Sequence, residues 1–179
     1  MIKMIAAVSI NGIIGIDNQI PWMGRYPDDM KFFRQMTKDS IVVMGRRTFE
    51  SMGSKPLPKR ENRVITSGCA VDVMNTTPLY SFDTIRDALD FPNPDNKDIW
   101  LIGGEGIYRE AVENRLADEI YITLIPETIN TTDKTVARFP FVHPIAFDRD
   151  IRQMHELADV KNEQHLSVAI YRPSKTVWF

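Results

Sequence analysis

Four short apolar runs, each followed by a segment with helical spacing, constrain the fold of this chain more than any other feature. Runs of this kind suit strands that are covered on both faces of a sheet. Strands that alternate with helices predict an α/β domain with a mainly parallel central β-sheet and about four flanking helices. We expect strands at residues 2–10, 40–45, 62–67 and 98–104, and helices at residues 28–37, 46–53, 83–90 and 105–115.

The last third of the chain has a different pattern. Residues 119–126 and 166–172 resemble strands, and no segment with helical spacing separates them. This arrangement predicts an antiparallel C-terminal edge of the sheet. Residues 91–98 and 128–135 are loops by composition. With 179 residues, of which 43% are hydrophobic, the chain is expected to form a single domain over residues 1–179.

Charge and residue usage argue against several classes of function. The net charge is −2, the pI is near 5.9 and no basic block occurs, so neither nucleic acid nor a membrane is an expected partner. The apolar start is too short for a signal peptide, which favours a cytoplasmic protein. Cys69 is the single cysteine, and His143, His155 and His165 lie far apart in the sequence, so no metal site is expected.

The expected helix at residues 28–37 carries a carboxylate on its apolar side. Asp28 falls at the edge of that side, in the position of an N-cap that accepts backbone N–H groups. Asp29 lies inside it, and although the helix dipole favours an acidic first turn, burying the charge is costly without a partner. We interpret Asp29 as a carboxylate with a raised pKa, suited to acid–base chemistry or to binding a cationic or amidine-like ligand. The apolar arc consists of Phe32, Met36, Asp29, Phe33, Thr37 and Met30.

Two strand–glycine–helix junctions suggest a nucleotide site. One lies at Gly45 and the other at Gly103 and Gly104. Glycine lets a phosphate approach the free N–H groups of a helix N-terminus, although it also occurs there merely to make the turn. Two such junctions in one small sheet predict a dinucleotide, but without the GxGxxG spacing, so a different nucleotide-binding α/β fold is implied. A 2′-phosphate, and hence NADPH over NADH, is favoured by Arg46, Arg47, Thr66 and Ser67.

Residues 11–22, NGIIGIDNQIPW, combine apolar side chains with residues that break regular structure. Gly12, Gly15 and the Asn-Asp pairs would weaken a strand. We therefore expect a loop whose apolar side chains serve a purpose other than filling the core.

Five segments together resemble dihydrofolate reductases. They are IAAVSINGIIGIDNQIPW, DDMKFFRQMT, VVMGRRTFESMGSKPLPKREN, IWLIGGEGIYREAV and ADEIYITLI, and they extend over nearly the whole chain. The P-W pair, the acidic residue on the next helix, G-R-x-T-[FW]-E-S, P-L-P-x-R-x-N and I-G-G-x-x-x-Y are jointly very specific. The resemblance implies NADPH-dependent reduction of 7,8-dihydrofolate to tetrahydrofolate, by hydride transfer to C6 and protonation at N5, and inhibition by antifolates.

The resemblance also implies the roles of residues at matching positions. Asp29 would bind the 2-amino group and the adjacent ring nitrogen of the pterin. Thr123 would form hydrogen bonds with Asp29 and with the pterin. Arg60 would pair with the α-carboxylate of the glutamate tail. Asp29, Thr123 and Trp22 form the expected catalytic group, with a water molecule carrying the proton to N5. Further substrate contacts would come from Ile5, Ala6, Met30, Phe33, Leu57, Ile102 and Tyr108.

For the cofactor, the resemblance implies that residues 11–22, hereafter the lid, cover the nicotinamide and the pterin. It also implies a cis peptide bond between Gly103 and Gly104. The expected NADPH contacts are Ala7, Ile14, Gly15, Asn18, Ile20, Gly45, Arg46, Arg47, Thr48, Thr66, Ser67, Ile102, Gly103, Gly104, Glu105, Gly106, Ile107 and Tyr108.

Some features depart from the family pattern. The segment MGRYPD between Trp22 and Asp29 is longer than usual, Lys59 replaces a turn glycine, and Trp178 and Phe179 have no family role. Two alternatives stay open: a related reductase that acts on a ribosylamino-pyrimidine in riboflavin biosynthesis, and a nucleotide-binding protein without enzymatic activity. A monomer is the expected state.

Overall fold

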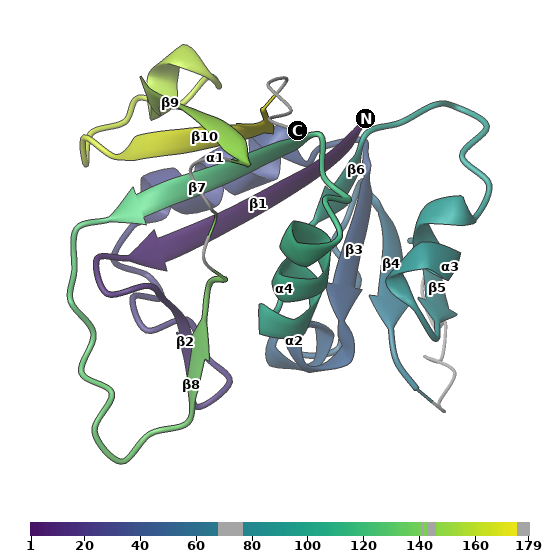
Figure 1. Ribbon diagram of the computed structural model, residues 1–179, viewed down its shortest axis with the longest axis horizontal. Coiled ribbons are helices and arrows are strands. Elements are labelled where there is room, and N and C mark those ends of the chain that lie inside the picture. The colour runs from purple at the N-terminus through teal and green to yellow at the C-terminus, as the bar shows by residue number, and fades with distance from the viewer. Residues whose placement is uncertain (68–76, 141, 143–145, 175–179) are drawn as a thin grey trace.

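The apolar runs assemble into one large sheet in the computed structural model, which describes residues 1–67, 77–140, 142 and 146–174. Within these ranges the sheet has eight strands in the order β5-β4-β3-β6-β1-β7-β10-β9, and a second sheet pairs β2 with β8 (Figure 1). Cys69, His143, Trp178 and Phe179 lie outside the described residues. The strands are β1 (Ile2–Ser9), β2 (Ile13–Ile16), β3 (Ile41–Gly45), β4 (Glu61–Ile65), β5 (Leu79–Phe82), β6 (Ile99–Leu101), β7 (Glu119–Ile125), β8 (Val136–Arg138), β9 (Phe147–Gln153) and β10 (Ser167–Pro173).

The directions of the strands confirm the predicted fold class. Neighbours from β5 through to β7 are all parallel, whereas β10 is antiparallel to both β7 and β9. The antiparallel edge therefore exists, but its outermost strand, β9, was not expected. Its sequence, FDRDIRQ, buries Phe147 and is otherwise mostly charged. Charged side chains are common on edge strands because they discourage pairing with other chains.

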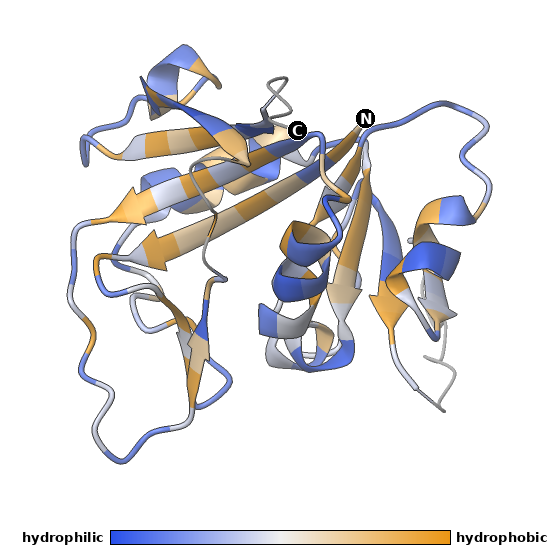
Figure 2. Ribbon diagram, in the orientation of Figure 1, coloured by the Kyte–Doolittle hydropathy of each residue, from blue (hydrophilic) through white to orange (hydrophobic). Residues whose placement is uncertain are grey.

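Helices cover both faces of the large sheet. On β1, Met4 and Ala6 face one apolar cluster with α3 and α4, while Ile5 faces a second cluster with α1 and α2. Figure 2 shows the apolar residues concentrated in the central strands that these helices cover. The helices are α1 (Pro27–Met36), α2 (Arg46–Ser51), α3 (Ile85–Asp90) and α4 (Glu105–Glu113), and a short 3-10 helix, η1 (Met154–Glu156), follows β9.

The expected helices are present with small shifts at their ends. For example, α3 begins at Ile85 because the hydroxyl of Thr84 caps it by accepting a hydrogen bond of 3.1 Å from the Asp87 N–H. No helix in the described part of the chain is both long and apolar enough to cross a membrane.

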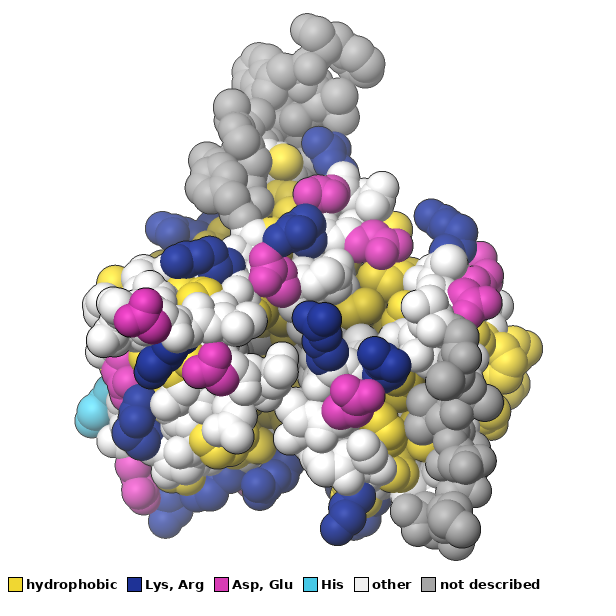
Figure 3. Space-filling view, turned by 90° about the horizontal axis from the view of Figure 1, so that it is seen from below, with side chains coloured by type: hydrophobic (Ala, Val, Ile, Leu, Met, Phe, Trp, Pro, Cys, Tyr) yellow, Lys and Arg dark blue, Asp and Glu magenta, His cyan; other side chains and the backbone are white. Residues whose placement is uncertain are grey.

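The carboxyl ends of the neighbouring strands β3, β6 and β1 lie at one edge of the sheet, where parallel α/β proteins bind ligands. β3 leads through Gly45 into α2, β6 leads through Gly103 and Gly104 into α4, and β1 leads into the lid. Figure 3 views the molecule from this side, and Lys and Arg are interspersed there with Asp and Glu. The fold thus brings both glycine junctions and the lid to one edge.

Candidate active site

The lid contains a short strand, which corrects the expectation of a loop. β2 pairs antiparallel with β8, and the pairing is irregular between Ile13 and Gly15. A Cβ added to Gly15 would lie 3.4 Å from that of Ala137, so glycine allows the two strands to approach closely. The chain then turns back at Asp17 and Asn18, whose φ angles are 49° and 62°. Asp and Asn tolerate this left-handed conformation, so the turn residues fit a hairpin.

The isoleucines of the lid divide between core and surface. Ile13 is 0% exposed and Ile16 is 8% exposed. The expectation that the apolar side chains of the lid serve a purpose other than filling the core is therefore wrong for these two, because both are already buried in the absence of a ligand. Ile14 is half-buried and Ile20 is 39% exposed, so both remain available. Trp22, at the far end of the lid, is buried.

Asp29 and Thr123 form the polar centre of the candidate substrate site. Burial raises the pKa of the Asp29 carboxyl to about 6, and the nearby Thr123 hydroxyl offsets part of that rise. The Thr123 hydroxyl is itself buried, and no group in the described residues completes a hydrogen bond with it. No Lys or Arg among those residues forms an ion pair with Asp29. Both groups therefore have hydrogen-bonding capacity left for a ligand.

Asp28 has a structural role, but it is not the N-cap that the sequence predicted. Tyr26 is the N-cap and Pro27 the first helical residue, so Asp28 lies in the second position of α1. Its carboxylate accepts a hydrogen bond of 3.0 Å from the Gln164 N–H, and its own N–H donates to the Gln164 side chain at 3.2 Å. No sequence pattern indicates this contact, because the partners lie 136 residues apart.

Apolar side chains around Asp29 come from several elements. Ile5 and Ile102 belong to the cluster beneath α1, with Phe33 and Leu57 packed against it, and Met30 is half-buried. The side chain of Ala6 instead faces the α3 and α4 side of the sheet. The Tyr108 hydroxyl donates to the Ile5 carbonyl oxygen at 2.8 Å. Burial, together with the Asp29 charge, raises the pKa of Tyr108. Four of the expected substrate residues, Ile5, Phe33, Leu57 and Ile102, thus share one apolar cluster with α1, whereas Ala6 and Tyr108 belong to the cluster on the other face of the sheet.

Arg60 is buried and held in a fixed orientation. Its Nε donates to the Thr37 hydroxyl at 2.9 Å, one terminal nitrogen donates to the Pro58 carbonyl at 2.7 Å and the other to the Arg34 carbonyl at 3.1 Å. A guanidinium has five N–H groups, so three bonds within the described residues leave two unused, one on each terminal nitrogen. The guanidinium also lies 5.8 Å from the centre of the Phe33 ring. Two unused N–H groups in this arrangement suit a carboxylate.

Lys59, immediately before Arg60, has a backbone conformation that favours glycine. Its φ angle is 57°, in the left-handed region.

The two glycine junctions lie against each other. The Gly45 N–H donates to the Gly103 carbonyl at 2.8 Å, and the expected cis peptide bond between Gly103 and Gly104 is present. A Cβ on Gly104 would lie 3.2 Å from the Thr48 hydroxyl, whereas one on Gly106 would meet nothing within 4 Å. The first turn of α4 is therefore open to an approaching group.

The other expected cofactor residues differ in their availability. The Arg46 Nε lies 3.5 Å from the Glu50 Oε1. Arg47 is exposed and forms no ion pair among the described residues. Glu105 is engaged, because its carboxylate binds the side chain of Arg109 and accepts from the Arg138 N–H at 3.3 Å. Ile107 and Thr66 are buried, Ala7 is half-buried and Ser67 is exposed.

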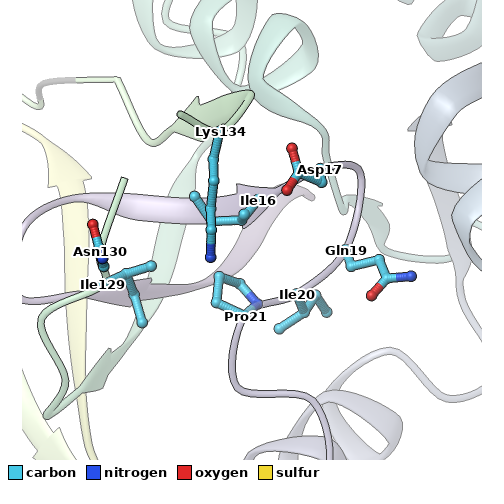
Figure 4. A pocket seen from close by; sticks show the side chains of 8 residues that line it. All are labelled: Ile16, Asp17, Gln19, Ile20, Pro21, Ile129, Asn130 and Lys134. Atoms are coloured by element: carbon cyan, nitrogen blue, oxygen red, sulfur yellow. The ribbon is translucent and has the colours of Figure 1, made fainter. Parts of the chain in front are cut away.

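A separate pocket of about 340 Å³ lies between the lid and the loop that joins β7 to β8 (Figure 4). The Lys134 side chain points into it, while the Asp17 carboxylate points away and accepts from the Thr135 N–H at 3.0 Å. Asp29 does not line it, so it is distinct from the candidate substrate site. Its lining residues are Ile16, Asp17, Gln19, Ile20, Pro21, Ile129, Asn130 and Lys134.

Comparison with known proteins gives consistent matches. The dihydrofolate reductase family profile matches residues 1–172. The dihydrofolate reductase of Buchnera aphidicola is 39% identical over 124 residues, which cover 69% of this chain and 71% of the relative. The enzyme of Bacillus subtilis is 35% identical over 125 residues, or 70% of this chain and 69% of the relative. A bifunctional dihydrofolate reductase-thymidylate synthase from Paramecium tetraurelia is 38% identical over 123 residues, or 69% of this chain and only 25% of that protein.

A solved structure agrees with these matches. Dihydrofolate reductase from Enterococcus faecalis, in complex with NADP(H) and RAB-propyl, superimposes with a TM-score of 0.76 and 25% sequence identity. The superposition covers 98% of this chain and 97% of the other.

Proposed function

This chain belongs to the dihydrofolate reductase family, and from that premise we propose that Asp29, Thr123 and Arg60 bind dihydrofolate while the two glycine junctions hold NADPH. The reaction is the NADPH-dependent reduction of 7,8-dihydrofolate to 5,6,7,8-tetrahydrofolate. Neither a ribosylamino-pyrimidine substrate nor a non-enzymatic role is favoured by any feature of the site.

The buried Asp29 carboxylate is the observation that carries the proposal. With a pKa of about 6 it is mainly ionised at pH 7, although its surroundings favour the neutral form. A pterin offers an amino group and an adjacent ring N–H that can donate to both carboxylate oxygens. This contact polarises the ring and raises the basicity of N5. Because the carboxylate binds an edge away from N5, a water molecule delivers the proton.

Thr123 and Arg60 orient the two ends of the substrate. The unpaired Thr123 hydroxyl donates to Asp29 and accepts from the pterin. The two unused N–H groups of Arg60 pair with the α-carboxylate of the glutamate tail, and the bonds to Thr37, Pro58 and Arg34 hold the guanidinium ready for it.

The residues at the glycine junctions fit a dinucleotide. A side chain on Gly104 would crowd Thr48, and a Cβ on Gly106 in the first turn of α4 would meet nothing, so there is room for a phosphate near the backbone N–H groups there. Arg46, Arg47 and Ser67 are the proposed 2′-phosphate contacts, and Ile14 and Ile20 exclude water from the nicotinamide. Bound NADPH supplies a hydride from nicotinamide C4 to C6 of dihydrofolate.

We further propose that residues 1–179 form a single dihydrofolate reductase domain, which acts as a cytoplasmic monomer and binds antifolates at the Asp29 site. The profile match over residues 1–172 and the almost complete superposition on one reductase chain support this proposal. Thymidylate synthase activity belongs to the Paramecium relative, only a quarter of which this chain spans.

Asp29→Asn tests the site. We expect the variant to lose about 10²- to 10³-fold in turnover at pH 7 and to regain part of it at low pH, where the substrate is already protonated. Turnover is measured as the loss of NADPH absorbance on addition of dihydrofolate. The wild type should be blocked by a 2,4-diaminopteridine and inactive towards a ribosylamino-pyrimidine. Wild-type turnover in Asp29→Asn at pH 7 would remove Asp29 from the mechanism.

Stability provides the folding control for this variant. Because burial raises the Asp29 pKa from 3.8 to about 6, the stability contributed by the protonated carboxyl is complete below pH 3.8 and is lost as the pH rises through about 6. Asparagine does not ionise, so at pH 8 the ligand-free variant should unfold no more readily than the wild type. The variant should gain at most about 3 kcal/mol in the free energy of unfolding at this pH. Asp28→Asn, the neighbouring carboxylate, should keep most of the turnover.

A further inference from the structure

Glu127, which follows β7, is bonded to the chain on both sides of the lid. Its backbone carbonyl accepts from the Ile10 N–H at 2.9 Å, immediately before the lid. Its carboxylate binds Arg25, three residues after the lid, with the Arg25 Nε at 3.0 Å and a terminal nitrogen at 2.5 Å. The Tyr26 hydroxyl donates to the same carboxylate at 2.9 Å. One residue thus holds both ends of the lid.

We propose that Glu127 is a positioning residue that clamps the two ends of the lid and holds the Asp29 turn of α1 against Thr123 of β7. The proposal rests on the roles proposed above for Asp29 and Thr123. Because Arg25 and Tyr26 lie in the segment that is longer than usual for the family, the clamp is a property of this chain's own residues.

The sequence positions of Arg25 and Glu127 explain how the clamp can affect the substrate site. Arg25 lies four residues before Asp29, and Glu127 lies four residues after Thr123. The ion pair therefore joins the two segments that carry the polar groups of the substrate site, close in sequence to each group. Gln164 also binds the first segment, since its side chain donates to the Arg25 carbonyl at 2.6 Å. A change in the Arg25–Glu127 contact shifts the start of α1 relative to β7.

The bonding of Glu127 is more directional than that of an ion pair with a single contact. Arg25 binds both carboxylate oxygens, a geometry that adds directional specificity to the charge interaction. Hydrogen bonds from Arg25 and Tyr26 hold the pKa of Glu127 below its ordinary value, so the clamp is ionised at neutral pH. Because Arg25 is exposed, the contact contributes to geometry more than to the stability of the fold.

Between its clamped ends, part of the lid borders a pocket. The pocket beside Ile20 and Pro21 lies between this stretch and Ile129 and Lys134 of the β7–β8 loop (Figure 4). Among the described residues the lid is bonded at its ends and along β2, and the Ile20–Pro21 stretch faces the pocket. A change at the ends is expected to be transmitted to the residues that face the ligands.

The other end of β7 supplies a matched control. There the carboxylate of Glu119 accepts from the Tyr121 hydroxyl at 2.8 Å and from the Arg172 Nε at 2.8 Å. Glu119 and Glu127 thus carry the same Glu–Arg–Tyr chemistry at opposite ends of one strand. Only Glu127 is bonded to the lid and to the segment before Asp29.

The test compares Glu127→Gln with Glu119→Gln. Both variants should lose similar amounts of thermal stability. Glu127→Gln should lower the single-turnover rate of hydride transfer about 10-fold and raise the KM for dihydrofolate, because small misplacements of reacting groups are costly. Glu119→Gln should match the wild type in both quantities. If Glu127→Gln fails to fold, Tyr26→Phe, which removes one bond of the clamp, should show the same pattern at about 2- to 3-fold.

The outcomes separate this inference from the assignment of the site. Equal kinetics in Glu127→Gln and Glu119→Gln, whether both are normal or both impaired, would overturn the clamp. Full activity in Asp29→Asn would overturn the site assignment and the clamp with it. Loss of activity in Asp29→Asn together with normal hydride transfer in Glu127→Gln would leave the site intact and overturn the clamp alone.

Discussion

Two buried arginines, Arg60 and Arg63, lie three residues apart and use their donors very differently. Arg63 is 0% exposed, and its Nε donates to the Glu61 carboxylate at 2.7 Å. One terminal nitrogen bonds the Ala88 and Phe91 carbonyls, and the other bonds the Pro92 carbonyl and lies 2.6 Å from Glu61. Each nitrogen of the Arg63 guanidinium thus has an acceptor, whereas two N–H groups of Arg60 have none among the described residues.

The difference separates a structural residue from a binding residue. Arg63 joins β4 to the end of α3 and has nothing left to offer a ligand. Arg60 and the Thr123 hydroxyl are buried and Asp29 is partly buried, and all three have hydrogen-bonding capacity that the described residues leave unused, which a folded protein tolerates mainly where a ligand completes it. Burial alone therefore does not identify the site, but buried polar groups without a complete set of partners do.

The largest effect on stability is expected from replacing Arg63, which removes all the hydrogen bonds of its guanidinium. Arg63→Met leaves the Glu61 carboxylate and three backbone carbonyls without their donor, and should cost about 3–5 kcal/mol of unfolding free energy. Denaturant unfolding measures this loss. At temperatures where the variant is folded, turnover and KM should match the wild type. A loss below about 1 kcal/mol would contradict the structural role of Arg63.

Arg60→Lys should affect substrate binding in addition to stability. Lysine keeps the charge but not the paired N–H groups, so we expect the KM for dihydrofolate to rise about 30-fold, equivalent to about 2 kcal/mol, with little change in kcat. Steady-state kinetics measure both constants. A dihydropteridine that lacks the glutamate tail serves as the control substrate and should not distinguish the variant from the wild type. Equal effects on both substrates would refute the contact with the carboxylate.

Much of the fold could be predicted because the central strands are buried on both faces. Their apolar runs and the intervening amphipathic helices are local properties of the sequence, and they located β1, β3, β4, β6 and the four helices. β2, β5, β8 and β9 were not predicted. The FDRDIRQ sequence of β9 has little apolar signal, and its pairing with β10 depends on partners that only the tertiary structure brings together.

The site divides in the same way. Asp29 could be identified from its place on the apolar side of one helix, and the glycine junctions from their local pattern. Arg60 and Thr123 were assigned by resemblance, because neither has a local signature. Glu127 and Arg25 are 102 residues apart, and no periodicity or motif connects them. Contacts of this kind depend on how the elements pack, which the sequence pattern alone does not contain.

The smallest effect on stability is expected from Thr123→Val, which also tests most closely the difference between structural and binding residues. Valine replaces a buried hydroxyl that has no hydrogen-bond partner among the described residues with a methyl group, so at a pH where the Asp29 carboxyl is neutral the ligand-free protein should be unchanged or up to about 1 kcal/mol more stable. Thr37→Val is the matched control, because the Thr37 hydroxyl donates to the Phe33 carbonyl at 2.7 Å and accepts from Arg60. Its removal leaves both partners unsatisfied and should destabilise the protein.

Ligand binding should respond to Thr123→Val in the opposite direction from stability. The lost hydrogen bond should weaken binding of a 2,4-diaminopteridine about 10-fold. Because the Thr123 hydroxyl lowers the pKa of Asp29, its removal should also move the titration of that carboxyl above about 6, which carbon NMR of the aspartate can follow. Weaker binding in a protein that is no less stable is the combination that only a hydroxyl reserved for a ligand produces. A destabilised Thr123→Val protein with unchanged affinity would place Thr123 with Arg63 among the structural residues.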